Sequence, residues 1–277
     1  MTGGAVAQGP LPLRCYSFAA LRRLGIRHGT FTRQGGVSEP PFLTLNCAVK
    51  TEDPRAAENR RRVLAALRMD PAGVIYASGC HGRDIVIADD LPLTAGSMTV
   101  LCGVDGLIAR RPGLCLSLCV ADCLPVFFAA PAANAVGLVH AGWHGVHLEI
   151  LPAAIELFAE RYGARPDDLI VAFGPAIHKE SYRARNPSQL GDPRWQPYLS
   201  AAESGEYHVD FIAMARQQVL AAGVRPDNLT DCGICTAEHN AEFFSCHREG
   251  YRSGRFFNFI ATSPAPCSPV EADAGIW

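Results

Sequence analysis

The chain has 277 residues and is 48% hydrophobic, enough for a sizeable core in one large domain or two small ones. Charged residues make up 19% and the net charge is −2, which argues against nucleic-acid-binding and polybasic membrane-binding proteins. The first ten residues lack a basic start and an apolar core, and prolines and an aspartate interrupt the most apolar stretch, 114–139. We therefore expect a cytoplasmic protein without a membrane span, whose eleven cysteines are mostly buried thiols.

Three segments have the apolar periodicity of helices. The first is 55–68, where Asp53 is suited to cap the helix and Pro54 to its first turn. The second is 146–162, with Pro152 near its start or at a kink. The third is 210–222, capped by Asp210 and ended by a glycine.

Short apolar runs between these helices predict strands. The predicted strands are 26–32, 74–77, 84–88, 106–110, 114–120, 125–129, 135–140, 169–173, 243–246 and 256–260. Many are apolar throughout, which is typical of sheets covered on both faces. Their order is irregular rather than strictly alternating with helices, so we predict an α+β fold of mixed sheets packed with helices.

The ends of the chain differ in composition from its middle. Residues 1–13 are rich in Gly, Pro and Ala, and 262–277 carry three prolines among acidic and small residues. No internal repeat or Ser/Gly linker divides the middle. We therefore predict a flexible N-terminus (1–13), a single catalytic domain (14–261) and a flexible C-terminal tail (262–277).

Three metal-binding side chains lie at or after the ends of apolar runs, among turn residues: His81, Cys123 and His140. Two imidazoles and one thiolate suit Zn²⁺, and three protein ligands leave a fourth position open, as in catalytic zinc sites. A histidine at a strand end is also common as a structural residue. Asp122, next to Cys123, is a candidate general acid or base, although strand alternation favours a role in orienting a ligand.

Short motifs spread over the chain form a second pattern. They are FTRQGGVS (31–38), LN (45–46), ENR (58–60), HG (81–82), ADCLPV (121–126), HAGW (140–143), GPAI (174–177), CT (235–236), FS (244–245) and GR (254–255). In this order and spacing the chain resembles the YfiH-type proteins, which are also described as multicopper polyphenol oxidase (laccase) domain proteins and as peptidoglycan editing factors. The resemblance implies a YfiH-like layered sandwich with one metal, usually taken to be zinc, on His81, Cys123 and His140.

The resemblance also implies chemistry on purine nucleosides. The activities associated with the family are phosphorolysis of adenosine, inosine or S-methyl-thioadenosine, and deamination of adenosine. The expected partners are then a small-molecule nucleoside and phosphate, with no nucleic acid or membrane, and the protein would be a monomer or a weak homo-oligomer. Zinc is the expected cofactor, and copper is the less favoured metal.

Further candidates for the binding site lie within the matched motifs. Arginine is suited to clamp phosphate, and Arg33, Arg60 and Arg255 are the candidates, although an arginine taken alone is more often a surface or structural ion-pair residue. Asn46 and Asn59 could orient a ribose hydroxyl or a base edge, or could be turn and helix-packing residues. Pocket positions are also expected for two residues, His144 and Cys235.

The chain departs from the family pattern at several places. Residues 79–80, His144, 178–182 and 246–248 differ from the usual motifs, and this puts the substrate in doubt more than the fold or the metal.

Three other functions remain open at this point. Cys123 could be a thiolate nucleophile, activated by His140 or His81, in a hydrolase that edits peptidoglycan precursors. Copper-dependent polyphenol oxidation is less favoured, because a multicopper site needs about ten ligands, mostly histidines, and the chain has nine histidines in total. A divergent, non-catalytic binding protein is the third alternative.

Overall fold

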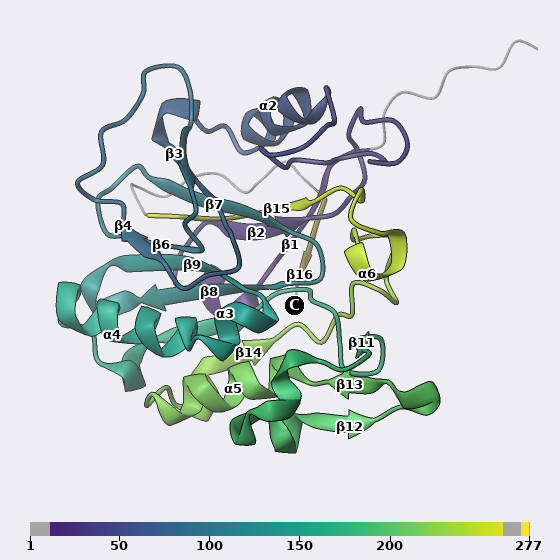
Figure 1. Ribbon diagram of the computed structural model, residues 1–277. Coiled ribbons are helices and arrows are strands. Elements are labelled where there is room, and N and C mark those ends of the chain that lie inside the picture. Colours follow the sequence, from purple (N-terminus) through teal and green to yellow (C-terminus); the bar gives the residue numbers. More distant parts are fainter. Residues whose placement is uncertain (1–11, 263–272, 277) are drawn as a thin grey trace, which may run out of the picture.

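Two β-sheets packed face to face form the centre of the molecule, and helices cover both outer faces (Figure 1). The computed structural model describes residues 12–262 and 273–276. The predicted α+β sandwich of mixed sheets is confirmed. Residues 1–11, most of the predicted flexible N-terminus, lie outside the described residues.

The first sheet has seven strands in both parallel and antiparallel pairs. In spatial order they are β16 (Asp273–Ile276), β1 (Arg14–Ser17), β2 (His28–Phe31), β15 (Phe256–Ala261), β7 (Cys115–Val120), β3 (Val74–Ser78) and β5 (Thr99–Cys102). β16 pairs with β1 in parallel. This pairing differs from our expectation of a flexible tail over 262–277, of which 263–272 and 277 lie outside the described residues.

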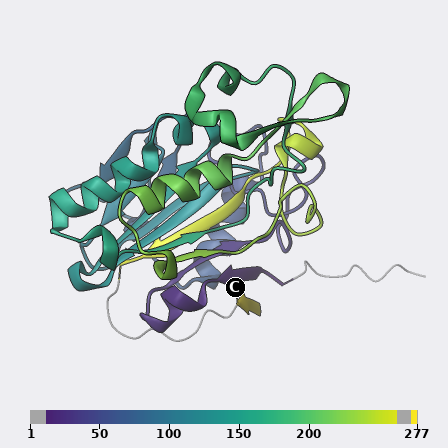
Figure 2. The same cartoon turned by 90° about the horizontal axis from the view of Figure 1, so that it is seen from below.

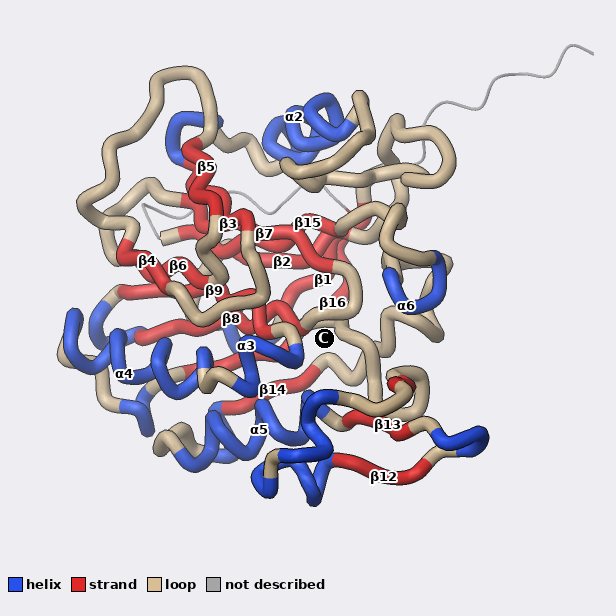
Figure 3. The backbone as a smooth tube through the Cα atoms, viewed as in Figure 1, coloured by secondary structure: helices blue, strands red, loops and turns tan. Residues whose placement is uncertain are grey.

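The second sheet has six strands. They are β14 (Leu229–Asp231), β10 (Ile170–Phe173), β8 (Leu124–Ala130), β9 (Ala135–Ala141), β6 (Gly106–Ala109) and β4 (Ile85–Ile87). A small third sheet contains β11 (Arg183–Ala184), β13 (Tyr207–Val209) and β12 (Leu199–Ala201), and Figure 3 shows β12 and β13 apart from the two large sheets.

Six α-helices complete the described part of the chain. They are α1 (Ala19–Arg23), α2 (Ala56–Ala66), α3 (Trp143–His147), α4 (Ile150–Tyr162), α5 (Phe211–Ala221) and α6 (Cys246–Glu249). α2 covers the outer face of the seven-stranded sheet, whereas α4 and α5 lie side by side on the outer face of the six-stranded sheet (Figures 1 and 2).

Strand β8 shows why its residues are apolar on both faces. Val126 and Phe128 pack in the core under α4 and α5, while Phe127 and Ala129 pack in the core between the two sheets. Successive side chains of a strand point to opposite faces, so a strand with helices on one side and a sheet on the other needs apolar residues throughout.

Two predictions of secondary structure were wrong. The run 243–246 is not a strand: Phe243 and Phe244 are buried in a turn, and Ser245 caps α6 by accepting a hydrogen bond from the backbone N–H of Arg248. The helix predicted over 146–162 is two helices, α3 and α4, separated at Glu149, whose φ of 62° is left-handed. The apolar spacing continues across this break, so periodicity alone could not reveal it.

Candidate metal centre

His81, Cys123 and His140 come together at one end of the sandwich. Their potential ligand atoms all lie within 4.8 Å of one another, and the two imidazole rings are 4.9 Å apart, centre to centre. His81 follows β3, Cys123 lies in the turn between β7 and β8, and His140 belongs to β9. The group therefore joins the seven-stranded sheet to the six-stranded sheet, and one ion could bridge all three side chains.

Two of the turns that present this group have left-handed backbone. His81 has a φ of 63° and Asp122 a φ of 77°. Residues other than glycine rarely adopt this conformation, and it is often found at functional sites. It lets the chain reverse direction sharply at His81 and immediately before Cys123.

A buried carboxylate that the sequence analysis missed, Asp105, holds both histidine segments. It is 0% exposed, and one of its oxygens accepts a hydrogen bond from Nδ1 of His140 at 2.8 Å. Its two oxygens also accept hydrogen bonds from three backbone N–H groups, of Cys80 (3.1 Å), His81 (3.0 Å) and Gly82 (2.8 Å). The position of Asp105 directly before the buried strand β6 was a signal that could have identified it.

The bond to Asp105 determines how His140 can act. With Nδ1 donating to the carboxylate, Nε2 is the nitrogen left to bind an ion, as in the carboxylate–histidine–zinc arrangement. Burial alone would raise the pKa of Asp105, but the hydrogen bond and charge of His140 and the backbone N–H donors hold it below its ordinary value. Asp105 is therefore an anion at neutral pH.

Cys123 lies among groups that favour its thiolate. Burial raises the pKa of this thiol, but the His140 and His81 rings outweigh burial and hold it below its ordinary value. Burial correspondingly lowers the pKa of His140, and the charges of Cys123 and Asp105 raise it above its ordinary value. The thiolate is the form of cysteine that binds metals.

Asp122 supports the turn that carries Cys123. Its carboxylate accepts hydrogen bonds from the hydroxyl of Thr236 at 2.6 Å and from the backbone N–H of His247 at 2.7 Å. Its backbone oxygen accepts a third from the N–H of Ile177 at 2.9 Å. Asp122 thus ties the turn of Cys123 to three separate segments of the chain.

A cavity of about 600 Å³ opens beside the three candidate ligands. This volume is within the range of small-molecule sites. Three of its lining residues, Trp143, Tyr182 and Phe211, form what we call the aromatic side, and two others, Lys50 and Arg255, form the cationic side.

The two sides come from different parts of the fold. On the aromatic side, the rings of Tyr182 and Phe211 pack at right angles, 5.9 Å apart. On the cationic side, the backbone N–H of Arg255 donates to Asn46, and its backbone oxygen accepts from the N–H of Cys47. Arg255 is therefore fixed to the segment that leads to Lys50. The guanidinium donates through Nη1 to the backbone oxygens of residues 253 and 254.

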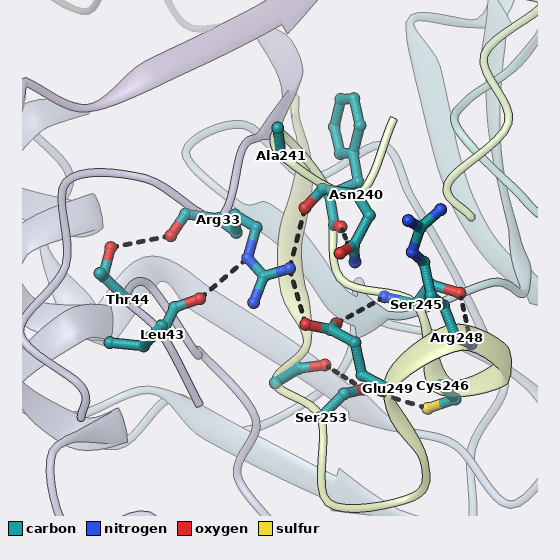
Figure 4. A network of polar contacts seen from close by, with 12 residues as sticks. Arg33, Leu43, Thr44, Asn240, Ala241, Ser245, Cys246, Arg248, Glu249 and Ser253 are labelled. Carbon is teal, nitrogen blue, oxygen red and sulfur yellow. Dashed lines mark hydrogen bonds and ion pairs between the residues drawn. The ribbon is translucent and has the colours of Figure 1, made fainter. Parts of the chain in front are cut away.

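Arg33 is not one of the residues that line the cavity. Its guanidinium makes an ion pair with Glu249 at 2.8 Å and donates to the backbone oxygens of Leu43 and Asn240, each at 2.9 Å (Figure 4). It also lies over the ring of Phe244, 4.4 Å from the ring centre. These contacts join α6 to the segment that follows β2, and they occupy the guanidinium of this predicted phosphate clamp.

Three further candidates, Arg60, Asn46 and Asn59, bond to segments that form part of the cavity wall. Asn46 and Asn59 are 0% exposed, and their amides bond to groups of the segments 37–38, 44–53 and 255. Arg60 donates to the backbone oxygens of Cys47 and Ala48. None of the three is among the residues that line the cavity.

The two predicted pocket residues also act through neighbours. His144 bonds through Nδ1 to the backbone oxygen of His81 at 2.7 Å, and thereby holds the segment of that ligand. Cys235 is 2% exposed, accepts from the backbone N–H of His178 at 3.4 Å and lies 3.5 Å from the Ser181 hydroxyl.

The segments that differ from the family motifs reach the cavity. Tyr182, Cys246, His247 and Gly79 all line it. This placement agrees with the expectation that these positions bear on which substrate is bound.

Within 12–262 and 273–276, none of the helices has both the length and the apolar character needed to cross a membrane.

Comparison with known proteins gives consistent matches over most of the chain. A family model described as multi-copper polyphenol oxidoreductase laccase matches residues 27–263. A purine nucleoside phosphorylase of Bacteroides thetaiotaomicron is 31% identical, covering 85% of this chain and 91% of that protein. Purine nucleoside phosphorylase YlmD of Geobacillus stearothermophilus is 34% identical, covering 84% of this chain and 88% of that protein.

Two solved structures are similar to this chain over most of its length. The crystal structure of YlmD from Geobacillus stearothermophilus matches with a TM-score of 0.80 and 33% identity, covering 87% of this chain and 93% of that chain. The crystal structure of the Bacillus licheniformis protein YfiH has a TM-score of 0.80 and 30% identity, covering 88% of this chain and 94% of that chain. The chain therefore belongs to the multi-copper polyphenol oxidoreductase laccase (YfiH/YlmD) family.

Proposed function

We propose that this protein is a zinc-dependent purine nucleoside phosphorylase acting on adenosine, inosine or S-methyl-thioadenosine. The observation that carries the proposal is the group His81, Cys123 and His140 beside a 600 Å³ cavity with an aromatic and a cationic side. The names of the relatives from Bacteroides thetaiotaomicron and Geobacillus stearothermophilus support the same activity.

The donor set fits zinc. Two imidazole nitrogens and a thiolate are ligands that zinc prefers, and three protein ligands leave one position for a reacting oxygen. His81, Cys123 and His140 would hold the ion, and Asp105 would orient His140. When bound, zinc supplies Lewis acidity toward an oxygen of phosphate or water.

Different residues of the cavity lining would bind the two substrates. Arg255 and Lys50 carry positive charge for the phosphate, and Trp143 and Phe211 offer apolar rings to the base. Holding both substrates in line favours attack of a phosphate oxygen on C1′ of the ribose as the bond to the base breaks. Asp122 would not exchange a proton, because its carboxylate already accepts two hydrogen bonds from the protein.

Adenosine turnover with and without phosphate tests the proposal. We expect zinc-loaded protein to produce adenine and ribose 1-phosphate only when phosphate is present, and chelator-treated protein to be inactive until zinc returns. Cys123→Ser should lose the activity, whereas Cys102→Ser, at an exposed cysteine, should retain it. No release of adenine by zinc-loaded protein would refute the proposal. Inosine formed without phosphate would show that the protein deaminates adenosine, a reaction in which water attacks C6 of the purine and ammonia leaves.

The arrangement of ligands favours this proposal over polyphenol oxidation. Among the side chains of the described residues, one group of three His, Cys, Asp or Glu is close enough to hold an ion. A multicopper oxidase needs about ten ligands for its mononuclear and trinuclear centres. His144 and His147 bond instead to the backbone of His81 and to the Trp195 ring nitrogen.

A further inference from the structure

Tyr182 is a tyrosine of the cavity lining whose hydroxyl is not satisfied by the described part of the chain. Tyr182 is half-buried and lines the cavity, yet among the described residues no group hydrogen-bonds to its hydroxyl. Tyr162, by contrast, donates its hydroxyl to Asp89 at 2.8 Å. A buried tyrosine usually finds a hydrogen-bond partner, so the Tyr182 hydroxyl is available to a bound ligand.

The ring of Tyr182 is held in place from two sides. Phe211 packs against it at 90° and a centroid distance of 5.9 Å, and His247 packs against it at 83° and 6.1 Å. The backbone is also fixed, because its N–H donates to His178 at 2.9 Å and its oxygen accepts from Val209 at 3.1 Å. The Tyr182 hydroxyl is therefore already held in position, so little side-chain entropy is lost when a ligand binds to it.

The turn that carries Tyr182 is anchored to the metal centre. Ile177 donates its backbone N–H to Asp122, the residue before Cys123, and Cys235 bonds to the backbone of His178. Burial raises the pKa of Tyr182, and the nearby charges of Cys123 and Asp122 raise it further. The phenol is therefore a hydrogen-bond donor at neutral pH.

We propose that Tyr182 donates a hydrogen bond to the purine base as it leaves, an inference that rests on the proposed phosphorolysis. Two observations place the base next to this hydroxyl. The ring of Tyr182 belongs to the aromatic side of the cavity, and the cationic side is suited to phosphate. A purine base bound on the aromatic side would present its ring nitrogens to the hydroxyl of Tyr182, the one tyrosine of that side.

In the proposed reaction one bond to C1′ forms as another breaks, and Tyr182 is unchanged at the end. A phosphate oxygen forms the new bond to C1′, and the electron pair of the C1′–N9 bond remains on the purine. The hydrogen bond from Tyr182 stabilises this negative charge, because a hydrogen bond to a charged acceptor is stronger than one to a neutral acceptor. The proton that monohydrogen phosphate loses passes through solvent to the purine, and the phenol keeps its own proton.

Tyr182→Phe tests the inference, because it removes the hydroxyl and keeps the ring packed on Phe211 and His247. We expect kcat for adenosine phosphorolysis to fall about 10- to 100-fold, the effect of losing one hydrogen bond to a charged group, with little change in KM for phosphate or in zinc content. Tyr207→Phe is the matched control: Tyr207 belongs to β13 and is not one of the residues that line the cavity, so its variant should stay within about 2-fold of the unmodified chain.

A second substrate separates a chemical role from a structural one. 6-Chloropurine riboside resembles adenosine in size, but its base is more stable as an anion and needs less help to leave. Tyr182→Phe should therefore impair this substrate clearly less than adenosine. Equal losses on both substrates, or no loss on adenosine, would overturn the inference while leaving phosphorolysis by the unmodified chain intact. Absence of phosphorolysis in the unmodified chain would instead refute the proposed function, and this inference with it.

Discussion

At the scale of the residue, Asp105 joins both histidine ligands through one carboxylate. Its negative charge is fully buried, which would be unfavourable without partners. The ring of His140 and the three backbone N–H groups of residues 80–82 provide those partners. A Cβ at Gly79 would lie 2.2 Å from Asp105 Oδ1, so the glycine allows this close approach.

Asp105→Asn should weaken zinc binding about 10- to 100-fold, the usual effect of losing a partner of a ligating histidine. The amide keeps the shape of the carboxylate, but it lacks the negative charge and presents N–H groups where oxygens now accept. Competition with a chromophoric chelator measures the affinity. Asp84→Asn, at a nearby exposed carboxylate, should leave the affinity unchanged. Equal zinc affinity in Asp105→Asn and the unmodified chain would contradict this role.

The three candidate ligands could be predicted from the sequence, whereas their support could not. His81, Cys123 and His140 are reactive residue types at strand ends, and this pattern is local. Asp105 lies 35 positions from the histidine that it orients, so its role depends on the pairing of β6 with β9. The ion pair of Arg33 with Glu249 could not be predicted for the same reason, because Glu249 is distant in the sequence.

At the scale of the element, His28 links β2 to the start of α1. Its Nε2 accepts a hydrogen bond from the backbone N–H of Phe18, the N-cap of α1, at 2.8 Å. Its Nδ1 lies 2.9 Å from the backbone oxygen of Ile26. An imidazole that accepts through Nε2 and donates through Nδ1 is neutral. Burial, with a smaller contribution from Arg22, lowers the pKa of His28 to about 4.

The lowered pKa of His28 makes stability depend on pH. Between pH 6.5 and 4 the unfolded chain binds a proton at this position and the folded chain does not, so stability falls as pH falls. We expect this residue alone to remove about 2 kcal/mol from the free energy of unfolding between pH 7 and pH 5. Urea unfolding at both pH values measures the loss. In His28→Gln the free energy of unfolding should fall by about 2 kcal/mol less between these pH values than in the unmodified chain. In His239→Gln, at an exposed histidine, it should fall as much as in the unmodified chain. An identical pH dependence in all three proteins would contradict the assignment.

Elements with a strong repeating pattern could be predicted, and those decided by distant contacts could not. The stripe formed by Val63, Leu64 and Leu67 identified α2, and nine of the ten predicted strands correspond to strands of the structure. The run 243–246 is just as apolar, but its phenylalanines fill the core from a turn. A short apolar run does not specify which of these occurs.

At the scale of the whole molecule, the candidate metal centre spans the two sheets. Cys123 lies where the chain passes from β7 of one sheet to β8 of the other, and the two histidines come from opposite sheets. The three ligands are thus brought together only by the packing of both sheets. A metal that binds this arrangement and not the unfolded chain stabilises the whole fold.

Zinc should therefore raise the free energy of unfolding by about 2.7 kcal/mol when free zinc is 100 times its Kd. Urea unfolding in zinc-buffered solution measures the increase, with each protein first treated with chelator. Cys123→Ser should lose most of it, whereas Cys102→Ser should keep it, because Cys102 is exposed and not one of the three candidate ligands. A stability that does not respond to zinc would show that the site does not bind the ion in the folded state.

The hydrogen bonds that Asp105 accepts have a consequence for protein design. Copying three ligands onto another scaffold would reproduce the donor atoms but not the turn 80–82, whose N–H groups need an anion to fold around. A successful transplant would have to carry Asp105, directly before β6, and that turn, just after β3, as one unit. A functional copy of this centre would therefore be a folded substructure rather than a set of three side chains.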